Sequence, residues 1–187
     1  MKLKHMTVLA NVISIAAAGP LAARAQDAAP PEFPEYRIKA AFLYHFVQFV
    51  EWPPRAFANS GSPLVIGIVG EDRFAGALDA AMRGKAVNGH SLVIRHPTRP
   101  AELKNCHVLF VGESEKRRVS EIIAAAGGAP VLTVGECDRF LQSGGMINFV
   151  IEGGAEKNVR FEINNDAARP AGLKISSRLL ALAWKKT

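Results

Sequence analysis

The spacing of apolar positions changes from element to element along the chain. Between residues 35 and 50 the apolar side chains recur at helical spacing and form one broad face, which predicts an amphipathic helix. Trp52 is followed by two prolines, and this sequence predicts the end of that helix. A short apolar run at 64–69 predicts a buried strand, and alternating residues at 91–95 predict a second. Two further strands are predicted at 108–111 and 131–134. Helical patterns lie between or after these strands, at 73–82, 114–126 and 138–142.

The last third of the chain carries a different pattern. Two apolar runs flank Gly153, Gly154 and Asn158, which predicts a β-hairpin. Further apolar residues then recur at helical spacing and predict a final helix: Leu173, Ile175, Leu179, Leu180, Leu182 and Ala183. Strands that alternate with helices favour a largely parallel sheet with helices on both faces. We therefore expect an α/β fold, a Rossmann-like three-layer sandwich with a mostly parallel sheet, a C-terminal antiparallel hairpin and a final helix.

The N-terminus has the pattern of a cleavable signal peptide. Lys2 and Lys4 precede an apolar stretch at 8–18, and Ala23-Arg24-Ala25 matches the small-x-small cleavage pattern. The apolar stretch is too short to span a bilayer, which disfavours a membrane anchor. The sequence thus predicts a signal peptide at 1–25, a Pro- and Ala-rich leader at 26–34, and one domain at 35–187, exported to the periplasm.

Charge and composition exclude some classes of protein. The net charge is +6, and three of the positive charges precede the expected cleavage site. The remaining excess is too small to indicate nucleic-acid binding. The charges are interspersed, as expected for the solvated surface of a globular domain.

Patterns that indicate catalysis or a cofactor are missing from the sequence. A dinucleotide fold places glycines against a pyrophosphate after its first strand, but here Gly70 is followed by Glu71 and Asp72, which would repel phosphate. The histidines do not pair at metal-ligand spacing. Ser176-Ser177 has no nucleophile elbow around it. We therefore expect no enzyme activity, no cofactor and no metal.

Cys106 and Cys137 are the two cysteines, and their state is left open. An oxidising compartment favours a disulfide between them. However, Cys106 precedes one predicted strand and Cys137 follows the next. Roughly five residues at about 3.3 Å each would separate their levels, whereas a disulfide tolerates a Cα separation of only about 7 Å. Free thiols are favoured. Glu136 and Asp138 would raise the pKa of the Cys137 thiol.

Four segments in series carry a resemblance to a known family. They are IKAAFLYHFVQFVEWP at 38–53, CHVLFVG at 106–112, PVLTVGE at 130–136, and the block from Gly144 to Trp184. In this order they resemble the YfiR-like periplasmic proteins. The resemblance implies regulatory binding: a periplasmic protein that represses an inner-membrane diguanylate cyclase through its periplasmic sensor region, and thereby limits cyclic-di-GMP signalling and biofilm. It also implies release by an outer-membrane lipoprotein. Better-known members have more cysteines and stabilising disulfides, so this chain departs from the family there.

Candidate partner-binding residues lie on two predicted surfaces. Trp52 ends the first helix and is hard to bury fully before two prolines. Arg160 and Glu162 alternate outward in the last strand, and Arg169 and Lys174 follow it. A solvated face is the plainer interpretation of these charges. The hairpin edge could also accept an added strand, and a homodimer is left open.

An alternative function stays open beside the cyclase hypothesis. Ligands of open α/β sheets bind beyond the carboxyl ends of the strands. Gly70, Gly112 and Gly135 follow three predicted strands and would either allow close approach of a ligand or merely turn the chain. A small-ligand-binding module that feeds a sensor kinase or a transport system would use such a pocket.

Overall fold

The computed structural model describes residues 34–153 and 158–184. Seven strands of this described part form one sheet, in the order β3-β4-β2-β5-β6-β7-β8. Neighbours from β4 to β7 are parallel, while β3 and β8 pair antiparallel at the two ends. Its strands are β2 (Leu64–Val69), β3 (Ala86–Val87), β4 (His90–Arg95), β5 (Val108–Val111), β6 (Leu132–Gly135), β7 (Ile147–Glu152) and β8 (Asn158–Ile163).

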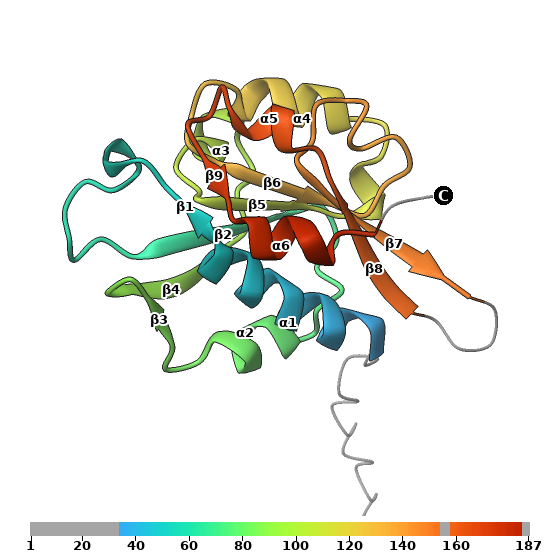
Figure 1. Cartoon of the computed structure of the whole chain (residues 1–187), viewed down its shortest axis with the longest axis horizontal. Helices are drawn as coiled ribbons and strands as arrows, with labels where there is room; N and C mark the ends of the chain where they lie inside the picture. Colours follow the sequence, from blue (N-terminus) through green and yellow to red (C-terminus); the bar gives the residue numbers. More distant parts are fainter. Residues whose placement is uncertain (1–33, 154–157, 185–187) are drawn as a thin grey trace, which may run out of the picture.

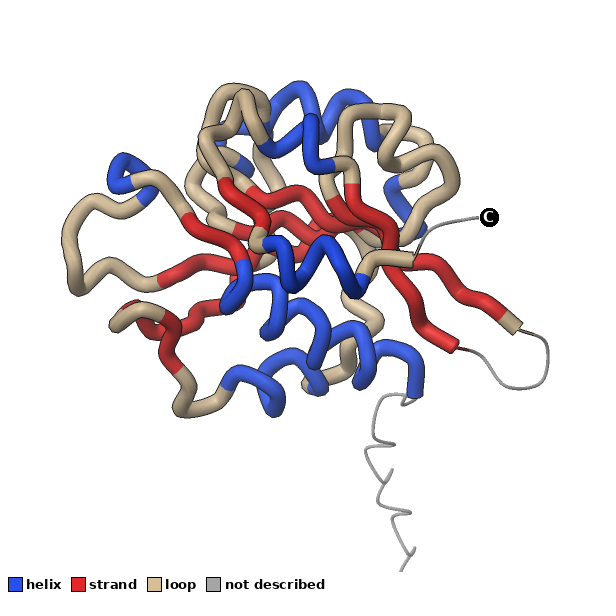
Figure 2. Tube along the Cα trace, in the orientation of Figure 1, coloured by secondary structure: helices blue, strands red, loops and turns tan. Residues whose placement is uncertain are grey.

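Helices cover both faces of this sheet (Figures 1 and 2). One layer holds α1 (Pro34–Phe49), α2 (Ala77–Met82) and α6 (Ser177–Leu182). The other holds α3 (Pro100–Leu103) and α4 (Val119–Ala126). The short helix α5 (Asn165–Ala168) is drawn near α4 in Figure 1, but its Ala168 belongs to the core on the α1 side. A separate pair, β1 (Val50–Glu51) and β9 (Lys174–Ile175), ties the end of α1 to the start of α6. The expected α/β class, with its parallel sheet, hairpin and final helix, is confirmed.

Strand alternation divides the interior into two cores. On the α1 side, Ile66, Phe110 and Phe149 pack against the helix. On the α4 side, the core includes Leu109 and Val111 from the same strand β5. Successive strand side chains point to opposite faces, so each central strand needs apolar residues at nearly every position. This requirement explains why the central strands appear in the sequence as unbroken apolar runs.

Several predicted boundaries are wrong, each for a local reason. The helix expected at 73–82 begins only at Ala77, because Ala75 and Gly76 adopt positive φ angles. The helix expected at 114–126 is a 3₁₀ turn at Glu113–Glu115 followed by α4. Turns replace the helix expected at 138–142.

The C-terminal helix is shorter than the apolar spacing predicted. Residues Lys174–Ile175 form β9, and α6 starts at Ser177 with the Ser176 hydroxyl accepting a hydrogen bond from Leu179 N. Leu173 and Ile175 are buried from an extended segment and not from a helix. Further short elements were not predicted, among them β1, β3, α3 and α5. The expected signal peptide (1–25) and nearly all of the leader (26–34) lie outside the described residues.

Candidate functional site

Glu136 gathers three hydrogen bonds at the carboxyl end of β6. Its Oε1 accepts from Tyr36 OH at 2.7 Å and from Glu113 N at 3.0 Å. Its Oε2 accepts from Lys39 Nζ at 2.6 Å. The carboxylate is almost fully buried. A carboxylate with three donors in a low-dielectric site is well satisfied, so this network fastens the first turns of α1 to the ends of β5 and β6.

Lys39 is the unusual member of this network, because its side chain is only 3 % exposed. It lies on the same face of α1 as the buried Tyr36, Ala40 and Leu43. Its ammonium also lies 3.7 Å from Glu35 Oε1 and 4.2 Å from the centre of the Tyr36 ring. A buried ammonium is tolerated only with such partners. This site was not predicted from the sequence, although a lysine within an apolar helical stripe indicates a buried acidic partner.

Tyr36 remains protonated in this setting. Burial, and then the hydrogen bond to Glu136, hold the pKa of its phenol well above the usual range. Arg73 lies close enough to oppose this effect partly. We call Tyr36, Lys39 and Glu136 together the lock, because their contacts hold α1 on the sheet. In the lock the proton stays on Tyr36, and Lys39 balances the negative charge on Glu136.

The strand-end glycines serve contacts within the chain. Gly70 has a positive φ of 97°, and a side chain there would collide with the Ser114 hydroxyl. The Ser114 Oγ accepts a hydrogen bond from Glu71 N at 2.9 Å. A side chain at Gly135 would collide with the Phe140 ring. Glycine is thus required at both positions because neighbouring groups of this protein approach the backbone closely there.

The structure gathers three of the predicted partner-binding residues around β1 and β9. Pairing of these strands sets Lys174 beside Glu51, with 3.9 Å between Nζ and Oε2. Trp52 follows β1 and is half-buried, since its Nε1 donates to His107 O at 3.3 Å. Arg169 precedes β9 and forms an exposed ion pair with Asp166 at 3.2 Å.

Arg160 and Glu162 form a second group, on β8. Arg160 Nε lies 3.0 Å from Glu152 Oε2 across the hairpin, and both side chains are about half exposed. Glu162 is half-buried and faces Asn148 in the register of the two strands. Figure 1 shows α6 between this group and the one around β9.

The hairpin edge is partly covered by the chain itself. Strand β8 is the last strand of the sheet, so one of its sides faces away from β7. The carbonyl of Phe161 accepts a hydrogen bond from Trp184 N at 2.8 Å. An added strand would therefore have to displace this contact or pair beyond it.

Both cysteines are buried free thiols. The Cys106 thiol contacts Glu102 O at the start of β5. The Cys137 thiol donates to Gly112 O at the other end of that strand. Burial first and Glu113 second raise the pKa of the Cys137 thiol to about 11. The charges of Glu136 and Asp138, from which we predicted this rise, contribute less, and the Glu136 backbone hydrogen bond lowers the pKa. Within the described part of the chain, no group of three metal-ligating side chains is found.

Comparisons with known proteins agree with this architecture. The sequence profile of the YfiR/HmsC-like family (DUF4154) matches residues 36–184. A crystal structure of a conserved domain protein from Vibrio cholerae O1 biovar El Tor aligns with a TM-score of 0.52 at 15 % identity. The alignment covers 79 % of this chain and 58 % of that one, so it supports the fold alone. No curated protein matches the sequence.

The fold and the matched profile together define a class of regulatory α/β proteins. The chain belongs to the YfiR/HmsC-like family. Members of this family are periplasmic and regulatory. None of the described helices has the length and apolar character needed to cross a bilayer.

Proposed function

We propose that this protein represses an inner-membrane diguanylate cyclase by binding the cyclase's periplasmic sensor region. The observation that carries the proposal is the match to the YfiR/HmsC-like family over residues 36–184. A binding role is also supported by the exposed side chains of Arg160, Arg169 and Lys174, whose ion pairs lie at the surface.

The repressor acts by shifting a population of states. A binding protein changes the activity of its partner only if it prefers one conformation of that partner. Here the preferred conformation is the inactive cyclase. Release follows when an outer-membrane lipoprotein binds the repressor and removes it from this equilibrium.

The group around β1 and β9 is the contact surface that we propose for the cyclase. It combines the half-buried indole of Trp52 with the exposed cations Lys174 and Arg169. Aromatic side chains and arginine are frequent interface anchors. The second group, Arg160 and Glu162, would extend the contact along β8. A homodimer through either surface is compatible with the same residues.

Reversal of charge at Arg169 tests this surface. Arg169→Glu should weaken binding to the cyclase's purified periplasmic domain by more than about tenfold, or about 1.4 kcal/mol. Its ion pair with Asp166 is exposed, so stability should change by no more than about 0.5 kcal/mol. Arg83→Glu, at an exposed arginine beyond α2, is the matched control and should bind like the wild type. Equal affinities for Arg169→Glu and the wild type would exclude this surface.

Side chains of the protein fill part of the pocket that the small-ligand alternative requires. Beyond β5 and β6, Tyr36 and Lys39 of α1 occupy the position that ligands take in open α/β sheets. A cavity of about 270 Å³ remains near Gly70, at the end of β2. A larger cavity lies elsewhere, on the α3 side of the sheet.

A further inference from the structure

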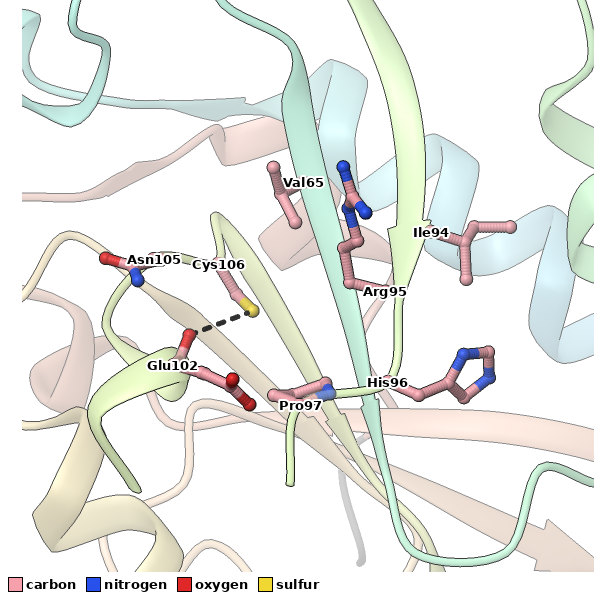
Figure 3. A pocket seen from close by; sticks show the side chains of 8 residues that line it. All are labelled: Val65, Ile94, Arg95, His96, Pro97, Glu102, Asn105 and Cys106. Carbon is pink, nitrogen blue, oxygen red and sulfur yellow. Dashed lines mark hydrogen bonds between the residues drawn. The ribbon is translucent and has the colours of Figure 1, made fainter. Parts of the chain in front are cut away.

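A cavity of about 540 Å³ opens over β2 and β4 (Figure 3). Val65 of β2 and Arg95 of β4 lie on its sheet side, and the segment around α3 forms its wall with Glu102, Asn105 and Cys106. Its volume falls in the range of roughly 300–1,000 Å³ that is usual for small-molecule sites.

Packing below the cavity depends on Gly67. A side chain there would collide with Cys106 Sγ and crowd the Pro97 ring. Gly67 is the register partner of Arg95 on the neighbouring strand. The missing side chain thus lets Cys106 and Pro97 settle against the sheet, and together with Val65 they give the cavity an apolar surface.

The charged groups that line the cavity differ in whether they can bind a ligand. Both oxygens of the Glu102 carboxylate are already held, by the Arg99 guanidinium at 2.6 and 2.9 Å and by the main-chain N–H groups of Thr98 and Arg99. Arg95, by contrast, is exposed and has no ion pair within the described residues. The Asn105 side chain is likewise without a hydrogen-bond partner there. The cavity therefore offers one available cation and one available amide.

Cys106 contributes a neutral surface. Burial raises the pKa of its thiol to about 11, so the thiol is protonated at neutral pH. It neither repels an anion nor acts as a nucleophile. His96 also borders the cavity, but its ring points away and its Nε2 lies 3.0 Å from Asp72 Oδ2.

We propose that this cavity binds a small organic carboxylate with an apolar body. The guanidinium of Arg95 would take the carboxylate, for which its planar fork is suited. Asn105 would donate a further hydrogen bond, and the apolar body would lie on Val65, Pro97 and the Cys106 thiol. The residues that line the cavity do not include Trp52, Arg169 or Lys174, and the proposal does not rest on repression of a cyclase.

Amide NMR of the purified protein tests the site with three probe acids: benzoate, hexanoate and 3-phenylpropionate. At millimolar concentration at least one acid should shift the amide signals of Val65, Asn105 and Cys106 with saturation. The matching neutral amide, such as 3-phenylpropionamide, should bind about tenfold more weakly or not at all, because it lacks the charge that Arg95 recognises. Arg95→Gln should weaken acid binding by at least about tenfold, and Asn105→Ala by a smaller factor.

Arg83→Gln is the matched control, since Arg83 is also exposed but lines a different cavity, on the other side of β4. It should leave acid binding unchanged. The proposal is overturned if none of the three acids shifts these signals, if acid and amide bind equally, or if Arg95→Gln and Arg83→Gln behave alike. Spectra of each variant without ligand establish that it is folded.

Discussion

At the scale of single residues, buried polar groups determine how this chain is held together. Glu136 and Lys39 each lie inside the protein with every strong partner supplied by the fold. A pair of this kind adds little net stability over an apolar pair, but removing one partner leaves an uncompensated buried charge. The two residues therefore behave as a unit.

Substitution of one member should be far more damaging than substitution of both. Lys39→Met should lower the free energy of unfolding by about 3–5 kcal/mol, because it strands the Glu136 charge. Adding Glu136→Gln should recover much of that loss, since a neutral amide oxygen can still accept from Tyr36 OH and Glu113 N. Urea denaturation measures both variants.

Lys174→Met is the control, because its ion pair with Glu51 is exposed on both sides. It should change the free energy of unfolding by no more than about 0.5 kcal/mol. If the changes in unfolding free energy caused by Lys39→Met and Glu136→Gln simply add in the double variant, the two residues are not a coupled pair.

His107 should make stability depend on pH. Its Nδ1 accepts a hydrogen bond from Val65 N at 3.0 Å, so Nε2 carries the proton and donates to Ala56 O at 3.0 Å. Burial lowers the pKa of His107 below its usual value. The unfolded chain then takes up a proton first as pH falls below about 6.5. The stabilising contribution is present above that pH and is lost as the solution becomes more acidic.

Melting temperatures between neutral pH and pH about 5 measure this dependence. Because other groups titrate in the same range, the variants are compared by the slope of melting temperature against pH. His107→Gln should be less stable than the wild type at neutral pH but should lose less stability on acidification. His45→Gln, at an exposed position, should keep the wild-type slope. Parallel curves for His107→Gln and the wild type would show that His107 does not titrate on unfolding.

At the scale of elements, α1 connects one of the two cores, the lock and the partner surface. Its Phe46 is fully buried among Phe42, Phe149 and Phe161, with ring centroids 5.0–6.1 Å apart. Its first turns carry Tyr36 and Lys39, and its end leads into β1. Loss of packing along this helix should therefore be felt at both ends of the sheet.

Phe46→Ala should lower the free energy of unfolding by about 3–5 kcal/mol, because it leaves a cavity between α1 and the sheet. Ile38→Ala, at a position on the same helix that is 42 % exposed, should cost much less. Denaturant titration of the two variants gives the comparison. An unchanged stability for Phe46→Ala would mean that α1 does not pack on the sheet as described.

Periodicity alone predicted the elements whose stability comes from the main cores. It located α1 and β2 closely, because their apolar spacing is regular over whole elements. It failed from Leu173 to Ile175, where apolar residues at helical spacing are buried from an extended strand that pairs with β1. Such pairing depends on a segment more than a hundred residues earlier, which no local pattern can show.

The candidate sites were predictable to different degrees. Exposed charges such as Arg169 and Lys174 were located from alternation and neighbourhood, and their role in binding stays a prediction. The lock was missed because Lys39 and Glu136 meet only after folding. The cavity beside Arg95 depends on Gly67 and Cys106 being neighbours, and this too is a tertiary fact.

At the scale of the whole molecule, the described part of the chain presents charged and aromatic groups on its surface. The sheet is covered on both faces, and the hairpin of β7 and β8 projects beyond the layers (Figure 1). A rigid body can hold a partner in one state without changing its own shape. This arrangement suits a regulator that works by binding and release.

Cellular cyclic-di-GMP after deletion of the gene tests repression of a cyclase most directly. Loss of a repressor should raise cyclic-di-GMP and promote biofilm, and a wild-type copy should restore the lower level. A copy with Arg83→Glu should restore it equally, whereas one with Arg169→Glu should restore it poorly at the same protein abundance. If deletion leaves cyclic-di-GMP unchanged under every envelope stress applied, the protein is not a repressor of a diguanylate cyclase.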